Sequence, residues 1–112
     1  MFRFDEKLQV YLHRDPVDFR YGMNSLSILV DQAIRLNPMD SSLYVFINRR
    51  CDRIKILGWQ DNGFWLMLKR LEANDRFVWP DRKSEVVTLT VELLHWLLGG
   101  ADIAALQRHP KR

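Results

Sequence analysis

The stretch YVFINRRCDRIKILGWQDNGFWLMLKRLEANDRFVWP, residues 44–80, decides the fold. Four runs rich in β-branched and aromatic residues lie within it: 44–47, 53–59, 64–71 and 77–79. Asn62-Gly63 separates the second and third runs and is a strong hairpin signal, because both residue types tolerate positive φ. The last run ends at Pro80, which has no N–H to donate to a sheet. These patterns predict an antiparallel meander of strands.

Regular patterns before this stretch predict one strand and one helix. Residues 8–13 alternate apolar and polar side chains, which is typical of a half-buried strand. Apolar residues within 26–34 then recur at spacings of three and four, which predicts a helix with one buried stripe. Asn24 and Ser25 are both candidate caps for this helix. Pro38 is expected to end it, because the residue before a proline is disfavoured in a helix.

The sequence after the stretch predicts a short strand and a second helix. Residues 86–89 form an extended apolar run. Thr90 is the candidate N-cap of the helix, and Glu92 falls in its first turn, where the helix dipole favours an anion. Gly99 and Gly100 are the expected stop signal, because glycine adopts the left-handed conformation common at helix ends.

Together these elements predict an α+β fold, with an antiparallel β-meander of about four to six strands, one helix before it and one helix after it. Residues 1–106 are expected to form a single α+β domain, since the chain of 112 residues has a common domain size. Residues 107–112 are interpreted as a basic flexible tail.

The composition excludes several classes of protein. A single cysteine rules out an internal disulfide framework and is typical of a reducing cytoplasm. Three widely spaced histidines and one cysteine give no zinc pattern, so neither a metal nor a cofactor is expected. There is no signal-peptide pattern, and no apolar run approaches the roughly 20 residues that span a bilayer. The sequence therefore predicts a cytoplasmic protein that does not enter a membrane.

The positive charge is concentrated in one part of the chain. The formal net charge is +3. Residues 48–83 carry 9 basic and 5 acidic side chains, a net charge of +4, whereas residues 1–47 have a net charge of −1 and residues 84–112 are neutral. This asymmetry indicates a surface for an anionic partner such as DNA. A solvated, arginine-rich sheet surface would give the same composition, and both interpretations stay open.

Six basic residues are the candidate nucleic-acid contacts: Arg49, Arg50, Arg53, Lys55, Lys69 and Arg70. Alternation along the strands places Arg53 and Lys55 on one face. A loop of Asn62-Gly63 alone would pair Lys55 with Arg70, and a four-residue loop, 60–63, would pair Arg53 with Arg70. Both registers place Arg70 on the same face as Arg53 and Lys55. A three-residue loop would instead pair Lys55 with Lys69. Like charges opposed across a ladder are mildly destabilising, which favours a site that holds an anion, although a neighbouring acid could also separate them.

A second polar cluster, Asp18 and Arg20, lies in the segment before the first helix. It has two interpretations, a local turn closed by an ion pair or the mouth of a site. The sequence contains no glycine-rich phosphate loop, no nucleophile elbow and no metal-ligand spacing. It therefore predicts no catalytic residues and a protein that is not an enzyme.

Several segments resemble one known protein family. They are 48–57, Trp59, 63–66, 69–72 and 76–80, together with 18–22 and Leu26 upstream and 97–102 downstream. This pattern is similar to the TnpB-type accessory protein of the insertion-sequence-66 family of transposable elements, which is distinct from the RNA-guided nuclease of the same name. The resemblance covers nearly the whole chain.

The resemblance implies a bacterial, non-catalytic accessory protein of transposition, encoded beside a separate transposase and a second small accessory protein. Two functions are compatible with it. The first is binding of DNA at transposon ends through the basic hairpin face. The second is that of a protein adaptor, which docks on the transposase or on the other accessory protein without touching DNA.

Overall fold

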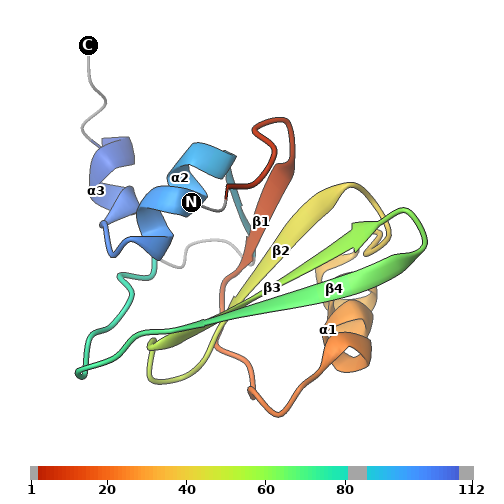
Figure 1. The fold of residues 1–112 in the computed structure, drawn as a ribbon, viewed down its shortest axis with the longest axis horizontal. Coiled ribbons are helices and arrows are strands. Elements are labelled where there is room, and N and C mark those ends of the chain that lie inside the picture. The colour runs from red at the N-terminus through yellow and green to blue at the C-terminus, as the bar shows by residue number, and fades with distance from the viewer. Residues whose placement is uncertain (1–2, 81–85, 109–112) are drawn as a thin grey trace.

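The computed structural model describes residues 3–80 and 86–108. Its strands and helices follow one another along the chain as drawn in Figure 1: β1 (Gln9–His13), α1 (Met23–Leu29), η1 (Val30–Ile34), β2 (Ser42–Ile47), β3 (Arg53–Gln60), β4 (Gly63–Arg70), β5 (Val86–Leu89), α2 (Val91–Leu98) and α3 (Ile103–Arg108). The predicted α+β class is confirmed, with helices both before and after the strands of the central stretch.

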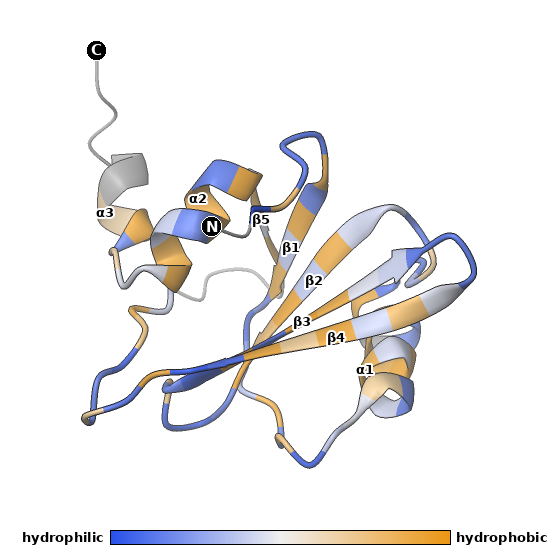
Figure 2. Ribbon diagram, viewed as in Figure 1, coloured by the Kyte–Doolittle hydropathy of each residue, from blue (hydrophilic) through white to orange (hydrophobic). Residues whose placement is uncertain are grey.

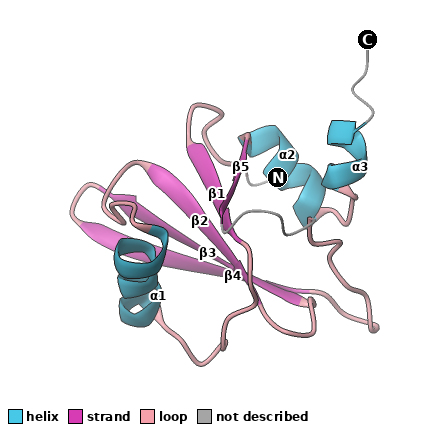
Figure 3. Cartoon of the chain, turned by 180° about the vertical axis from the view of Figure 1, so that it is seen from behind, coloured by secondary structure: helices cyan, strands magenta, loops and turns pink. Residues whose placement is uncertain are grey.

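The strands form one five-stranded sheet in the order β4-β3-β2-β1-β5. Neighbours pair antiparallel except β1 and β2, which run parallel. The parallel pair follows from the connection, because α1 carries the chain across one face of the sheet between β1 and β2 (Figure 3). The meander predicted from the sequence therefore corresponds to β2, β3 and β4 within a larger mixed sheet.

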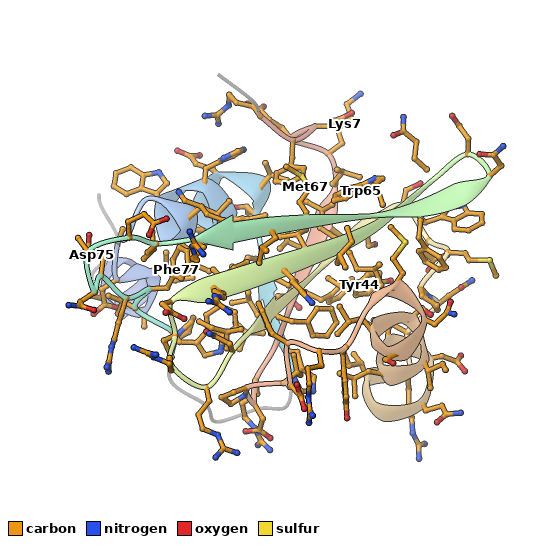
Figure 4. All side chains as sticks on the ribbon, turned by 60° about the horizontal axis from the view of Figure 1, so that its bottom comes forward. Lys7, Tyr44, Trp65, Met67, Asp75 and Phe77 are labelled. Atoms are coloured by element: carbon orange, nitrogen blue, oxygen red, sulfur yellow. The ribbon has the colours of Figure 1, made fainter. Side chains whose placement is uncertain are left out.

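Both faces of the sheet are covered by helix, and each has its own core. On one face, Tyr44, Phe46 and Leu57 pack against Leu26 and Val30 of the first helical segment. On the other face, strand residues pack against α2 and α3, and this core includes the following buried residues: Val10, Leu12, Val45, Ile54, Ile56, Leu94, Leu97 and Ile103. Figure 4 shows the division, with Tyr44 on the α1 side of the sheet and Trp65 and Met67 on the other side. Strand β2 lies between the two cores, and all six of its residues are buried.

The predicted strand at 77–79 is wrong. Phe77 is 3% exposed and donates its backbone N–H to the carbonyl oxygen of Cys51 at 2.7 Å, outside any sheet ladder. The indole N–H of Trp79 donates to the carbonyl oxygen of Arg14 at 3.1 Å. These aromatic residues therefore anchor a loop that crosses the end of the sheet. The strand-like pattern of residues 77–79 therefore belongs to an irregular segment in which Phe77 and Trp79 are each held by a separate contact.

The ends of the first helix differ from the expectation. It begins at Met23 after Gly22, and no side chain caps it, so the predicted caps Asn24 and Ser25 are wrong. It ends in the π-helical turn η1, after which Arg35 adopts the left-handed conformation at φ 61°, before Pro38 is reached. The wider π turn lets the backbone N–H of Leu36 reach the carbonyl oxygen of Val30 at 3.1 Å.

The ends of the second helix follow the sequence signals. The side-chain oxygen of Thr90 accepts the backbone N–H of Leu93 at 3.1 Å, as predicted for its N-cap. Gly99 follows the last residue of α2, and Gly100 has φ +98°. The short helix α3, not predicted, extends to Arg108, and residues 109–112 of the predicted tail lie outside the described residues. Figure 2 shows the hydropathy of these elements, with apolar stripes on α2 and alternation along β4.

Candidate nucleic-acid interface

The turn between β2 and β3 is built around one side chain, Asn48. Its Oδ1 accepts the backbone N–H groups of Asp52 and Arg53, both at 3.0 Å. Its Nδ2 donates to the Asp52 carboxylate at 2.5 Å. The backbone closes the turn as Cys51, at φ 60°, donates its N–H to the carbonyl oxygen of Asn48 at 3.1 Å. The backbone N–H of Asn48 also donates to the carbonyl oxygen of Arg53 at 3.2 Å, so the turn is held by a set of internal hydrogen bonds centred on Asn48.

The same turn is supported from outside by the chain that follows β4. Leu71 donates its N–H to the carbonyl oxygen of Asp52 at 2.9 Å, and Phe77 donates to that of Cys51 at 2.7 Å. Arg49 and Arg50 occupy the tip, and both side chains are exposed. The two arginines thus project from a fixed backbone. The strand and charge patterns of the sequence did not single out Asn48 for this role, although asparagine is a common side-chain acceptor for turn N–H groups.

The hairpin register places two of the predicted arginines directly opposite each other. Arg53 pairs with Arg70, which is the pairing of the four-residue loop. Pairing continues to Gln60 and Gly63, so the tip consists of Asp61 and Asn62, and not of Asn62-Gly63 alone. Both arginines are exposed. Arg70 donates to the Glu72 carboxylate at 2.8 Å, which partly neutralises it.

Lys55 lies on the same face as Arg53 and Arg70, and its ammonium group stabilises the loop before α1. Its ammonium group donates to the carbonyl oxygens of Phe19 and Tyr21, both at 2.8 Å, and lies 4.9 Å from the centre of the Phe19 ring. Partial burial lowers the pKa of Lys55 from its ordinary value. Arg53, Lys55 and Arg70 line one hollow of about 420 Å³. Within it, two of the three N–H donors of Lys55 are already used to hold the loop before α1.

Lys69 lies on the opposite face of the sheet from Arg53 and Arg70. Its ammonium group donates to the carbonyl oxygen of Leu98 at 2.7 Å, at the end of α2, where a cation complements the helix dipole. The structure therefore brings together five of the six predicted contacts, at one end of the sheet, and places Lys69 apart from them.

The Asp18–Arg20 pair adjoins the arginine turn. Asp18 accepts hydrogen bonds from Nε, at 2.9 Å, and Nη2, at 2.5 Å, of Arg20. The loop around Asp18 also lines a hollow of about 370 Å³ with Asn48, Arg49 and Arg50. The two polar clusters predicted separately from the sequence are thus neighbours. The local ion pair is confirmed, and it leaves the adjacent turn arginines uncompensated.

The Asp18 carboxyl is expected to titrate at about pH 2. The side-chain hydrogen bond from Arg20, together with the backbone N–H of Arg20, lowers its pKa from 3.8 to about 2. Because the folded-state pKa is depressed, the contribution of this pair to stability is present at neutral pH and is lost only as pH falls towards 2. A carboxyl-carbon NMR titration measures the midpoint. In Arg20→Gln the midpoint should rise towards the ordinary value, and an unchanged midpoint in this variant contradicts the assigned cause.

The charge balance of the interface favours an anionic partner. Among the residues that the structure describes, Arg49, Arg50 and Arg53 make no ion pair, since the recorded pairs are Arg14–Asp15, Arg20–Asp18 and Arg70–Glu72. Asp52 is the acid next to them. Its pKa is lowered first by the hydrogen bond from Asn48 and then by the charges of Arg50 and Arg53. One carboxylate beside three arginines leaves a net positive surface.

Two features are absent from the described residues, 3–80 and 86–108. No group of three or more histidine, cysteine, aspartate or glutamate side chains there could hold a metal ion. No helix there is long and apolar enough to cross a membrane.

Comparisons with known proteins point to one family. Residues 8–108 match the model of the family described as IS66 Orf2-like protein. An uncharacterized protein of Sinorhizobium fredii, y4jC, is 34% identical, and the match covers 92% of this chain and 87% of that protein. A second protein of the same organism, y4hO, also uncharacterized, is 32% identical over 95% of this chain and 88% of its own length. No solved structure matches the chain.

Proposed function

The chain belongs to the family of IS66 Orf2-like proteins, and we propose from this premise that it binds DNA at transposon ends as a non-catalytic accessory protein. Family membership associates the chain with transposition. The proposed DNA contacts form the arginine surface, which we define as Arg49, Arg50, Arg53 and Arg70. The proposed partners are the DNA of the element's ends, the transposase and the second small accessory protein.

The observation that carries the proposal is the rigid presentation of unpaired arginines. A mobile, solvated surface would have to order its backbone on binding, at a cost in conformational entropy. Here the hydrogen bonds of Asn48 fix the tip before any partner arrives. Arg53 stands at the start of β3, directly after the turn. Guanidinium groups carried on a fixed backbone suit the phosphates of DNA, which arginine binds through two parallel hydrogen bonds.

Contacts of this kind predict a broad and salt-sensitive affinity. Phosphate contacts position a protein on DNA and carry no sequence information by themselves. Each phosphate neutralised adds about 0.9 to the slope of log affinity against log salt concentration. The arginine surface should therefore bind terminal-repeat and random duplexes with comparable affinity, and any preference for the ends is proposed to come from the transposase.

The test of the proposal is DNA binding by the double variant Arg49→Ala/Arg50→Ala. Affinity should fall about tenfold per arginine, because a hydrogen bond to a charged group contributes about 1.5 kcal/mol. The salt slope should fall by about two. Fluorescence anisotropy on terminal-repeat and random duplexes at several salt concentrations measures both. Arg3→Ala and Lys7→Ala are the matched controls, since each also removes one positive charge, from an exposed side chain outside the arginine surface.

The outcomes separate the proposal from its alternatives. If both controls weaken binding as much per charge as the turn variant does, the interaction follows net charge and the arginine surface is not the interface. If the turn variant keeps its DNA affinity and loses association with the transposase, the adaptor function is correct. Lys55→Ala is unsuitable as a test, because it would also release the carbonyl groups of Phe19 and Tyr21.

The adaptor function is supported by a different observation. Large side chains just before α1 and along it are exposed: Tyr21 at 42%, Met23 at 40% and Ile28 at 53%. Exposed apolar residues of this size favour a protein contact. A pull-down of purified transposase by Ile28→Lys, compared with the unaltered chain, tests whether this helix contributes.

A further inference from the structure

The sheet has one long open edge, and it is β4. The strand order places β4 at one end of the sheet and β5 at the other. Strand β5 has four residues, whereas β4 has eight. Among the described residues, β4 pairs with β3 alone, and Figure 4 shows it running along the near side of the sheet. A short edge strand is a common protection against unwanted pairing, and β4 lacks it.

The hydrogen-bond pattern identifies which backbone groups face outward. Leu71 donates to the carbonyl oxygen of Asp52, in register with the β3–β4 ladder. Because hydrogen-bonded and non-hydrogen-bonded pairs alternate in an antiparallel ladder, the odd-numbered residues of β4 bond to β3. The backbone groups of Phe64, Leu66, Leu68 and Arg70 therefore point away from the sheet. Together they form a ladder without a partner strand.

The centre of this edge is apolar and unguarded. Leu68 is 59% exposed and Met67 is 38% exposed. Edge strands are normally protected by an inward-pointing charge, a proline or a bulge, and 64–68 contains none of these. Lys69 cannot act as the guard, because its ammonium group is held by the carbonyl oxygen of Leu98.

We propose that β4 pairs with β4 of a second copy of this chain, antiparallel and centred on Met67, to form a continuous ten-stranded sheet. A twofold axis perpendicular to the sheet keeps the two faces of both copies aligned, so side chains that meet come from the same face. The outward backbone groups then meet in register, since Leu66 lies opposite Leu68 of the second copy and Phe64 lies opposite its Arg70.

The sequence of β4 is complementary to itself in this register. The two most exposed apolar residues of the strand are covered, because Met67 meets Met67 and Leu68 meets Leu66. Lys69 lies opposite Trp65 and Arg70 opposite Phe64, so neither cation faces another cation across the new ladder. A basic strand from another protein would oppose cation to cation at this edge. The pairing of apolar residues and the separation of the cations together therefore favour a second copy as the occupant.

A hollow beside the β4 edge also favours a second copy of this chain as the partner. It measures about 810 Å³, lies on the α2 side, and is lined in part by Phe4, Met67 and Trp96. Trp96 is 51% exposed. With Met67 at the axis, the hollows of the two copies adjoin, and the dimer would cover apolar surface from α2 as well as from β4. The interface is thereby larger than a single strand pair.

The oligomeric state of the purified protein tests the proposal. Sedimentation velocity over a hundredfold range of concentration should show a dimer that dissociates on dilution. Leu68→Pro should be monomeric at the concentration where the unaltered chain is fully dimeric, because proline removes an outward N–H and leaves the β3–β4 bonds intact. A thermal unfolding curve of Leu68→Pro checks that this variant is folded. Ile28→Lys alters an apolar residue of α1 that is 53% exposed and is not part of the β4 edge, and this variant should stay dimeric.

Disulfide cross-linking tests the register. In a non-hydrogen-bonded antiparallel pair the Cα atoms are about 4.5 Å apart, within the range of a disulfide. Met67→Cys in a Cys51→Ser background should therefore form a covalent dimer on mild oxidation, and Ile28→Cys in the same background should not. A chain that is monomeric throughout overturns the proposal. So does a dimer that survives Leu68→Pro, or one in which Met67→Cys fails to cross-link. None of these measurements includes DNA.

Discussion

Substitution of Gly58 by alanine is expected to destabilise the fold by about 1–3 kcal/mol, the usual cost of an overpacked core. A Cβ at Gly58 would lie 2.2 Å from Cζ2 and 2.5 Å from Cε2 of the Trp65 ring. The ring has little room to withdraw, because it stacks on Phe4 at 6.0 Å between ring centres, and Phe4 is itself in the core. Equilibrium unfolding in urea measures the change.

A control and a second substitution separate this clash from general effects of glycine. Gly63 also lies in the hairpin, and a Cβ there would meet no atom within 4 Å, so Gly63→Ala should change stability little. In a double-mutant cycle, Trp65→Leu should remove most of the additional cost of Gly58→Ala. Equal effects of Gly58→Ala and Gly63→Ala contradict the prediction. So does additivity of Gly58→Ala with Trp65→Leu.

Much of the fold could be predicted because its signals are local. The alternation at 8–13, the apolar runs of β2 to β4 and the Thr90 cap each depend on neighbouring residues, and each is present in the structure. The order of the strands depends on contacts distant in sequence. The parallel pairing of β1 with β2 requires the chain to cross the sheet through α1, and no periodicity within either strand encodes that.

In the candidate site, too, features that depend on neighbouring residues could be predicted, and contacts distant in sequence could not. Alternation predicted that Arg53 and Arg70 share a face, and the register agrees. It could not predict that Lys55 binds the carbonyl oxygens of Phe19 and Tyr21, which are 36 and 34 residues away in sequence. Charge counting identifies basic residues, and the neighbours of each one decide whether its charge is available.

Asn48→Ala is expected to lower both stability and DNA affinity, although it removes no charge. The backbone N–H groups of Asp52 and Arg53 would lose their acceptor. The free energy of unfolding should fall by about 1–2 kcal/mol, because the Asp52 donor is partly buried, whereas the exposed Arg53 donor can bond to water. Arg49 and Arg50 would then project from a mobile turn. On the proposed function, their contacts with phosphate would carry an added entropic cost, and affinity should fall several-fold.

Stability and salt slope together distinguish Asn48→Ala from the loss of the turn arginines. Arg49→Ala/Arg50→Ala should lower affinity and the salt slope while leaving unfolding in urea almost unchanged, because both side chains are exposed. Asn48→Ala should lower affinity with the salt slope nearly unchanged, since every cation is still present. The pKa of Asp52, which the Asn48 hydrogen bond lowers, should rise towards its ordinary value in Asn48→Ala. Full DNA affinity in a destabilised Asn48→Ala variant would show that rigidity of the turn is not what the interface requires.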